Sequence, residues 1–304
     1  MGEATIPEGM GYLRRYQQLT NNSGVLISIV AIVLMPLAMA CAAQRTRDKD
    51  PKPKPANSKP IKAKTVEIVP FEASIESLKP AEVPEWFADA KLGIFMHWGP
   101  QSIPGVASTW YARWIYEQGS EGYKYHCATY GHPSKFGYKD ICKLFKAPKF
   151  DQAQADKLVA LYKQAGARYV VPVAVHHDNF DMWDSKYQPR WNSVVTSGKD
   201  VVGMWKNACD KEGMHLGVAS HFARTYRWLQ PSHGSDRSGP MAGVPYDGQD
   251  PANADLYGEK WKDDGSFPDF WYEQRSDVGP PAFEKNFEDR LRDLMDKYLS
   301  LIHI

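Results

Sequence analysis

Short apolar runs that end in histidine recur three times along this chain. The runs and the histidines that follow them are 93–96 with His97, 170–175 with His176 and His177, and 216–220 with His221. Apolar runs of this length, bounded by turn residues, predict buried β-strands. If the strands are parallel, the histidines lie together at their carboxyl ends, which is where α/β folds hold their functional groups.

The segments that precede the second and third runs have the apolar period of amphipathic helices. One is bounded by Asp151 as a predicted N-cap and Gly166 as a predicted stop, and the other by Asp200 and Gly213. The apolar positions on their predicted buried faces are Leu158, Val159, Tyr162 and Ala165, then Val201, Met204, Trp205 and Ala208. Helix, glycine and strand in repeated order predict parallel strands joined by helical crossovers, which is an α/β fold.

A last helix is predicted from about Pro281 to Tyr298. Its apolar side consists of Phe283, Phe287, Leu291, Leu294 and Tyr298. The same rhythm would place a fourth strand next, but only the hexapeptide Leu299–Ile304 follows. This hexapeptide resembles the translation of a sequencing-library adapter, so we interpret residues 299–304 as an artefact. We therefore expect no fourth strand and exclude His303 from the candidate site.

The amino-terminal residues have the pattern of an exported leader. Residues 25–40 are uncharged and mostly apolar and follow two arginines, so 1–43 is predicted to be a signal peptide region. The run is short for a bilayer span and contains Pro36, which argues against a permanent membrane span. Cys41 could instead carry a lipid anchor. In either case we expect a secreted or periplasmic protein.

The rest of the chain has the composition of a globular domain behind a tether. Residues 44–83, basic and proline-rich near their start, predict an extended spacer, and the folded part begins near Pro84. The formal net charge of +1 gives no reason to expect a nucleic-acid partner. The four cysteines show no C-x-x-C pair, so neither a zinc site nor a disulfide framework is predicted.

The residues alone leave three interpretations of the histidines open: core packing, metal ligation, and hydrogen bonding to a sugar. Buried imidazoles need partners, which weakens the first. Neutral imidazole is a common metal ligand. However, the first run lacks a His-x-His pair, and adjacent histidines in an extended strand, such as His176 and His177, point to opposite sides. The aromatic neighbours of the histidines, which suit a sugar ring, are Trp98, Trp110, Tyr111 and Trp183.

At these residues the chain resembles a known family. The motifs are Trp86-Phe87, KLGIFMHWG (91–99), SIP (102–104), Trp110-Tyr111, AGARY (165–169) and HHDNFDMWDS (176–185). Together they resemble the α-L-fucosidases of glycoside hydrolase family 29, over residues 84–298. The resemblance implies a (β/α)8 TIM-type barrel, of which about the first three β/α units are present. It also implies a retaining glycosidase that releases terminal α-L-fucose from a fucosylated oligosaccharide or glycoconjugate, with no cofactor and no metal.

The resemblance also implies roles for single residues. It makes His97, His176 and His177 the residues that hold the fucose hydroxyls, with Trp110 and Tyr111 as an aromatic pair at the site. His221 stands where many members place a tyrosine that faces the sugar, and it completes the substrate-binding candidates. Members often carry other residues at Thr109, Val175 and Asn179, so linkage preference does not follow from the match.

No catalytic residue is assigned in this chain. The resemblance implies a nucleophile at the end of the fourth barrel strand and an acid/base further on, so the fragment as written is predicted to be inactive. Asp178 is interpreted as a structural partner of the histidine turn. Two alternatives are kept, a non-catalytic relative that only binds fucosylated glycans and a metal-dependent barrel hydrolase.

Overall fold

The computed structural model describes residues 74–78, 83–147, 149–260, 280–298 and 301–303. The chain divides into two compact units, 1–70 and 71–304, and every described residue lies in the second. The predicted signal peptide region and Cys41 therefore lie outside the described residues, as does most of the predicted tether. Among the helices that the structure describes, none combines the length and the hydropathy that a membrane span requires.

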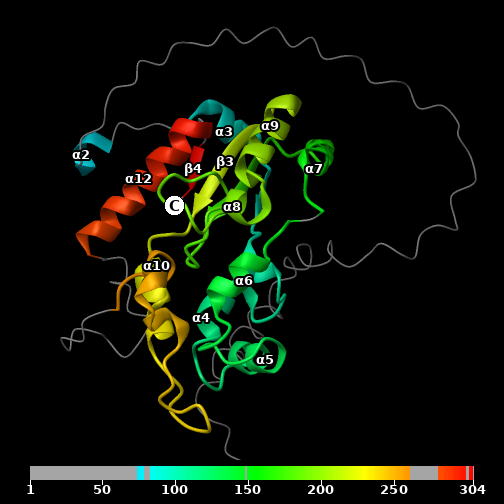
Figure 1. The fold of residues 1–304 in the computed structure, drawn as a ribbon. Coiled ribbons are helices and arrows are strands. Elements are labelled where there is room, and N and C mark those ends of the chain that lie inside the picture. Colours follow the sequence, from blue (N-terminus) through cyan, green and yellow to red (C-terminus); the bar gives the residue numbers. More distant parts are fainter. Residues whose placement is uncertain (1–73, 79–82, 148, 261–279, 299–300, 304) are drawn as a thin grey trace, which may run out of the picture. The chain divides into compact units, whose positions relative to one another are not determined.

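One parallel sheet organises the second unit (Figure 1). Its strands, in spatial order, are β1 (Gly93–Met96), β2 (Tyr169–Val175), β3 (His215–Ser220) and β4 (Leu301–His303). In this register Gly93 lies beside Tyr169, and Tyr169 lies beside His215. The parallel order with helical connections confirms the predicted α/β class, and the first three strands form where the apolar runs predicted them.

Strand β4 corrects one expectation. We expected no strand after the last helix, but residues 301–303 pair in parallel with β3, with Leu301 beside Gly217. The physical reason is that three residues of backbone suffice to satisfy part of the open edge of β3. The count of about three β/α units is unaffected, because no helix follows β4 among the described residues. Whether residues 299–304 come from an adapter stays a prediction.

Three longer helices connect the strands. These are α7 (Gln152–Gln164), α9 (Val201–Glu212) and α12 (Pro281–Tyr298). The Asp151 carboxylate accepts a hydrogen bond from the backbone N–H of Gln154, and Asp200 does the same for Gly203, which confirms both predicted N-caps. Gly213 ends α9 with a φ of +63°, a backbone conformation that favours glycine.

The predicted apolar faces are largely buried or half-buried. The exception is Ala165, which the sequence pattern placed on the inner face of α7 and which is exposed. The physical reason is that the helix ends at Gln164, so Ala165 is its C-cap and no longer follows the helical face. Helices α7 and α9 pack against each other.

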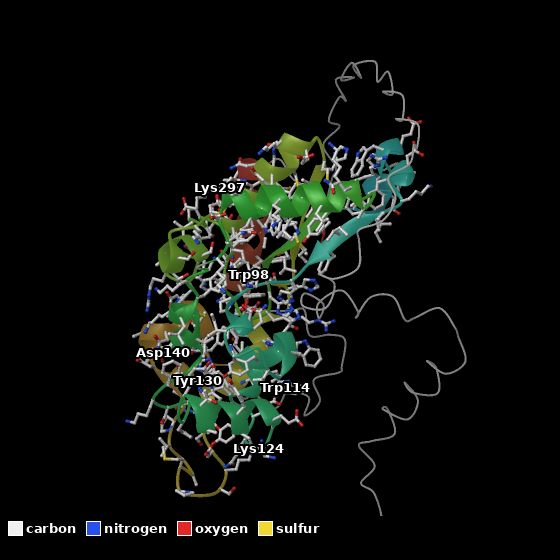
Figure 2. All side chains as sticks on the ribbon, turned by 90° about the vertical axis from the view of Figure 1, so that its right-hand side faces the viewer. Trp98, Trp114, Lys124, Tyr130, Asp140 and Lys297 are labelled. Carbon is white, nitrogen blue, oxygen red and sulfur yellow. The ribbon has the colours of Figure 1, made fainter. Side chains whose placement is uncertain are left out.

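Short helices fill the connections between these elements. They are α2 (Ile75–Leu78), α3 (Glu85–Ala90), η2 (Pro100–Ser102), η3 (Ser108–Trp110), α4 (Tyr111–Trp114), α5 (Glu121–Thr129), α6 (Tyr138–Leu144), α8 (Ser193–Ser197), α10 (Thr225–Trp228), η4 (Gln230–His233), η5 (Asp247–Gln249), η6 (Pro251–Asn253) and α11 (Ala254–Tyr257). Helix α2 is a single turn inside the segment 44–83 that the composition assigned to a tether. Figure 2 shows Trp98 just past the end of β1, with Trp114 and Lys124 in the short helices that follow.

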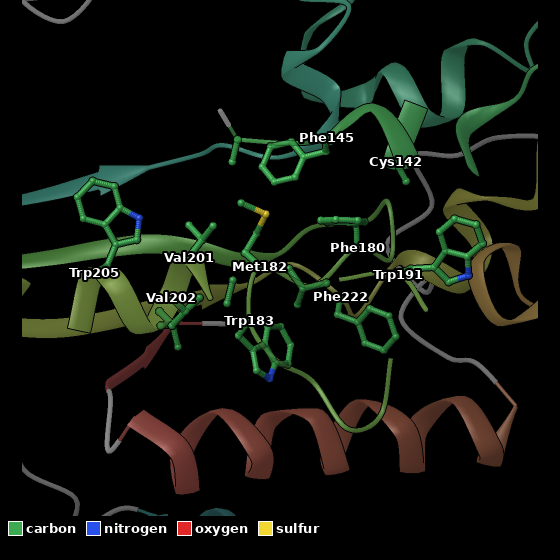
Figure 3. Packing of buried hydrophobic residues seen from close by; sticks show 14 of the residues in the cluster. Cys142, Phe145, Phe180, Met182, Trp183, Trp191, Val201, Val202, Trp205 and Phe222 are labelled. Carbon is green, nitrogen blue, oxygen red and sulfur yellow. The ribbon is translucent and has the colours of Figure 1, made fainter. Parts of the chain in front are cut away.

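The core lies where the sheet meets the long helices. Trp98 packs edge-on against Phe145 and Phe150, with ring centroids 5.0 and 5.1 Å apart. On the other side, Trp183 and Phe222 face α12 (Figure 3). These contacts hold the segments that follow β1, β2 and β3, and the histidines lie in those segments.

Candidate functional site

The four strand-end histidines form one cluster, which we call the histidine cluster: His97, His176, His177 and His221. His176 is at its centre, with ring centroids 4.4 Å from His97, 4.3 Å from His177 and 5.4 Å from His221. It is 9% exposed, and the other three are half-buried. The structure thus confirms that the three strands bring their histidines to one place.

The backbone after β2 explains how two adjacent histidines join the same cluster. The register between β2 and β3 shifts between Val173 and Val175, and the strand ends at Val175. His176 already belongs to a turn, in which the N–H of Asn179 donates to its carbonyl oxygen at 3.2 Å. Adjacent histidines diverge only in an extended chain, and this turn supplies the exception that lets His176 and His177 approach each other.

Burial disfavours the charged form of three rings in the cluster. Desolvation, followed by the neighbouring His221, lowers the pKa of His97 to about 4. Burial likewise lowers the pKa of His177 to about 4, and lowers that of His176 further still because three imidazoles surround it. At neutral pH each of these three rings has one nitrogen that donates and one that accepts, which suits sugar hydroxyl groups.

Two ring nitrogens in the cluster lack a hydrogen-bond partner among the described residues. They are the Nδ1 atoms of His176 and His177, and both are buried. Buried polar atoms are almost always satisfied in native proteins, by protein, water or ligand. These two nitrogens therefore need a partner that the described part of the protein does not supply.

The same arrangement has the donor set of a metal site. One ligand atom from each of His176, His177 and His221 can be chosen so that all three lie within 4.8 Å of one another. Neutral imidazoles are good ligands for transition-metal ions. The sequence argument against a metal relied on the missing His-x-His pair and on the divergence of adjacent histidines, and the turn after β2 removes only the second ground.

The predicted aromatic pair is divided by the fold. Trp110 packs edge-on against Trp228, with centroids 5.1 Å apart, and the Trp228 ring lies 4.8 Å from that of His177. Tyr111 is fully buried, and its hydroxyl pairs with Nδ1 of His126 at 2.6 Å. The structure brings Trp110 close to the histidine cluster through Trp228, and it places Tyr111 in the core.

Trp228 is the site residue that the sequence argument missed. It is 8% exposed, and its indole N–H has no partner among the described residues. It lies in α10, shortly after His221. Its place in the loop after a strand-end histidine was the available indication. Trp183, by contrast, is fully buried in the core, whereas Trp98 packs on Phe145 and lines the same small hollow as His97 and His176.

Comparison with known proteins assigns this chain to a family. The family model for alpha-L-fucosidase matches residues 60–303. This chain belongs to the alpha-L-fucosidase family. The alpha-L-fucosidase of Dictyostelium discoideum is 31% identical over 162 residues, which cover 51% of this chain and 33% of the relative. The plasma alpha-L-fucosidase of Homo sapiens is 32% identical over 171 residues, which cover 55% and 35%.

Solved structures agree with this family. The crystal structure of Thermotoga maritima alpha-fucosidase in complex with fucose is 28% identical to this fucosidase-family chain, with a TM-score of 0.52. The match covers 77% of this chain and 49% of that chain. The chain spans about a third of the length of the curated relatives named above. The resemblance to glycoside hydrolase family 29 is confirmed.

Polar contacts from α12 hold the turn of this fucosidase-family chain that carries His176 and His177. Arg290 is 2% exposed, donates to Oδ1 of Asn179 at 2.6 Å and forms a buried ion pair with Asp181. Burial raises the pKa of Asp181 to about 6, and the Arg290 guanidinium opposes that rise. The turn is thus fixed from the side opposite the cluster.

Asp178 also has partners within the protein. It accepts hydrogen bonds from the Tyr138 hydroxyl at 2.5 Å and from the N–H of Phe180 at 3.3 Å. Burial raises its pKa to about 6. These contacts fit the structural role that the sequence argument gave to Asp178.

Proposed function

We propose that this chain supplies the sugar-holding part of the catalytic barrel of an α-L-fucosidase that releases terminal α-L-fucose from glycans. Its substrate-binding residues are His97, His176, His177 and His221, with Trp228 and Trp110 beside them. The observation that carries the proposal is the histidine cluster, with two unsatisfied ring nitrogens, at the carboxyl ends of parallel strands. Family membership and the likeness to the fucose complex support it.

The completed architecture that we propose is a (β/α)8 barrel. The support is the parallel order β1-β2-β3-β4 with helical crossovers, and the TM-score of 0.52 with the Thermotoga maritima enzyme. In such barrels the functional groups lie on the loops at the carboxyl ends of the strands. The histidine cluster has this position.

Retaining hydrolysis needs two carboxyl groups about 5–5.5 Å apart. In the turn after β2, Asp178 and Asp181 are buried and already engaged by Tyr138 and Arg290. We therefore assign neither of them as nucleophile or acid/base, and we propose that the 304 residues bind fucose without cleaving it. The purified chain should release no measurable nitrophenol from an aryl α-L-fucoside, and clear release would contradict this part.

Fucose binding by the chain can be tested directly. Titration with L-fucose should change the tryptophan fluorescence, because Trp228 lies 4.8 Å from His177. His176→Ala should abolish the change, whereas His215→Ala should keep it, because His215 is exposed at the opposite end of β3. An unchanged titration in His176→Ala would refute the assignment. A non-catalytic relative that only binds fucosylated glycans would give the same titration. The two alternatives differ in the full-length protein, which cleaves an aryl α-L-fucoside only if it is a fucosidase.

A metal-dependent barrel hydrolase is a second candidate, and the close approach of His176, His177 and His221 favours it. It predicts one equivalent of a transition metal in the purified chain and loss of that metal in His221→Ala. The fucosidase proposal predicts that added Zn²⁺ at most competes with L-fucose. Elemental analysis separates the two.

We further propose that the protein is exported, as a secreted or periplasmic protein. The apolar run 25–40 supports this, and Cys41 is the candidate for a lipid anchor. Expression with and without residues 1–43 followed by fractionation tests the proposal. Equal export of both forms would contradict it.

A further inference from the structure

One buried carboxylate, Asp247, links the segments that follow β1 and β3. It is 8% exposed and begins η5, in the segment after β3. Its Oδ1 atom accepts a hydrogen bond from the Tyr116 hydroxyl at 2.7 Å, and its Oδ2 atom accepts one from the Tyr257 hydroxyl at 2.6 Å. Tyr116 lies in the segment after β1, and Tyr257 is the last residue of α11. Asp247 therefore joins two segments that are far apart in the sequence.

The same two hydroxyl groups bind the first turn of α6. The oxygen of Tyr116 accepts from the N–H of Tyr138 at 2.9 Å, and the oxygen of Tyr257 accepts from the N–H of Lys139 at 2.9 Å. The first N–H groups of a helix have no partner within it, so these two bonds supply what the helix lacks. Each hydroxyl group accepts from α6 and donates to Asp247. The carboxylate thus holds both hydroxyls in the orientation that accepts from the helix.

The close approach of Asp247 to α6 depends on Gly137. A Cβ atom at position 137 would lie 2.1 Å from Oδ2 of Asp247, so any side chain there would displace the carboxylate. The Lys139 ammonium group lies 3.6 Å from the same oxygen. Burial raises the pKa of Asp247, and the bonds from the two tyrosine hydroxyls oppose that rise. The fold therefore stabilises a buried carboxylate at the beginning of α6.

Both elements that Asp247 holds also contact the turn after β2. From α6, the Tyr138 hydroxyl donates to Oδ2 of Asp178 at 2.5 Å. From α11, the carbonyl oxygen of Leu256 accepts from the side-chain amide of Asn179 at 2.7 Å. Both bonds are buried, and the two residues that they hold directly follow the adjacent histidines of the cluster. Two separate routes thus lead from Asp247 to the turn that carries these histidines.

We propose that Asp247 is a positioning residue for the sugar site, and that it sets the turn of His176 and His177 through Tyr138 and Tyr257. The inference rests on the proposed function, because it takes the histidine cluster as the fucose site. A binding site works only when supporting hydrogen bonds hold its side chains close to the productive geometry. Without the carboxylate, α6 and α11 lose a shared anchor, and the two rings no longer match the hydroxyl groups of one sugar.

Asp236 offers a matched control in the same segment after β3. It is 5% exposed, and it accepts hydrogen bonds from the Tyr123 hydroxyl at 2.5 Å and the Tyr246 hydroxyl at 2.6 Å. It is thus also a buried carboxylate that two tyrosines share. Among the described residues, neither of these tyrosines forms a hydrogen bond with the turn after β2. Loss of Asp236 should therefore affect stability without affecting the site.

The test compares Asp247→Ala with Asp236→Ala in the 304-residue chain. Urea unfolding should show a loss of stability in both variants, because each leaves two buried hydroxyls without their acceptor. Calorimetric titration with L-fucose should show an affinity about three- to tenfold lower in Asp247→Ala, which corresponds to about one hydrogen bond to the sugar. In Asp236→Ala the affinity should stay within about twofold of the parent chain.

Tyr138→Phe is the second variant, and it keeps the test decisive if Asp247→Ala does not fold. It preserves the buried ring and removes only the hydroxyl group that reaches Asp178. Because the route through α11 remains, we expect a smaller loss of L-fucose affinity, about threefold.

NMR of the histidine ring nitrogens reports the geometry without any ligand. In folded Asp247→Ala and Tyr138→Phe the ring ¹⁵N signals of His176 and His177 should shift, and in Asp236→Ala they should not. A residue that contributes only to stability changes the unfolding midpoint and leaves these native-state signals unchanged.

The outcomes separate this proposal from the proposed function. Unchanged L-fucose affinity in Asp247→Ala and Tyr138→Phe, or an equal loss in Asp236→Ala, would overturn the positioning role while fucose binding stands. If the parent chain binds no L-fucose, the proposed function fails, and the ring signals then decide. Shifts confined to Asp247→Ala and Tyr138→Phe would support the positioning of the histidines, and unchanged signals would overturn it.

Discussion

The buried ion pair between Arg290 and Asp181 joins α12 to the turn that carries the histidines, and its removal has a calculable cost. Arg290 is 2% exposed and Asp181 is 0% exposed, so solvent screens neither charge. Arg290→Met keeps an apolar chain against Phe222, whose ring centroid lies 3.9 Å from the guanidinium carbon. The variant therefore removes mainly the charge and its hydrogen bonds.

Breaking one partner of a buried pair costs about 3–5 kcal/mol in unfolding free energy. Protonation of Asp181 reduces part of this cost. Burial already raises its pKa to about 6, and without Arg290 its pKa rises further, so that the carboxyl group takes up a proton at neutral pH. We therefore expect the loss at pH 7.5 to be near the lower end of the range, about 3 kcal/mol.

The loss should also depend on pH. At pH 5 the carboxyl group of Asp181 is largely protonated in the parent chain as well, so the pair contributes less and the loss falls to about 1–2 kcal/mol. Urea unfolding at both pH values, followed by tryptophan fluorescence, measures this difference. Asp181→Leu added to Arg290→Met should recover much of the stability, since no unpaired carboxyl group remains.

Arg292→Met is the matched control for this experiment. Arg292 is on the same helix, but it is exposed and pairs with Glu288 at 2.7 Å, so its replacement should leave the unfolding midpoint almost unchanged. An Arg290→Met variant as stable as Arg292→Met, or a loss that is the same at pH 5 and pH 7.5, would show that the pair does not hold the turn.

Three further predictions concern the cluster and its supports. Acid should destabilise the chain. The pKa values of His97 and His177 are about 4 in the folded chain, against 6.5 in the unfolded chain. The stability contributed by the neutral rings is therefore present above pH 6.5 and lost as the pH falls toward 4. The raised pKa values of Asp178 and Asp181 act in the opposite direction, but the lowered pKa values of three histidines outweigh them. Urea unfolding midpoints at pH 7 and pH 4.5 measure the direction of the stability change. Asp200→Ala should cost about 1–2 kcal/mol in urea unfolding, because Asp200 caps α9 and also accepts from Tyr298 at 2.7 Å; a loss below 0.5 kcal/mol would contradict it. Trp228→Ala should weaken L-fucose binding about tenfold in calorimetry, and unchanged affinity would remove Trp228 from the site.

Elements whose boundaries depend on local chemistry could be predicted from the sequence. The caps Asp151 and Asp200 and the stop Gly213 act through hydrogen bonds and backbone conformation within one turn, and the structure has them as predicted. The apolar runs of β2 and β3 became strands for a similar reason, since a continuous apolar run in a parallel sheet is buried on both sides, whereas β1 is half-buried and Phe95 is exposed. The gathering of the histidines then followed from strand direction alone.

The composition of the site depended on contacts that no local pattern contains. Tyr111 follows Trp110 directly, yet it turns into the core because His126 offers a buried partner for its hydroxyl. Trp228 reaches the cluster because Arg113 ties the segments after β1 and β3 together. Both outcomes are set by residues more than ten positions away, so the apolar period of the chain carries no information about them.

Helix α12 shows why a correct helix prediction can still miss the function of the helix. The apolar period correctly placed Phe283, Phe287 and Leu294 toward the core. The most deeply buried polar side chains of the same helix, Arg290 and Asp293, also face inward, against the expectation that charges lie outside. They do so because the turn after β2 presents groups that need partners.

Both inward charges satisfy groups in this turn and the residues that follow it. Arg290 satisfies Asn179 and Asp181, and Asp293 accepts from the indole N–H of Trp183 at 2.8 Å. Both contacts join residues that are about 110 positions apart in the chain. Because the turn bears His176 and His177, the geometry of the candidate sugar site depends on polar contacts from α12 as much as on the strands that carry it. A substitution in α12 that preserves its apolar face and its helix can therefore still displace the two histidines, which is why the Arg290 variants should be assayed for L-fucose affinity as well as stability.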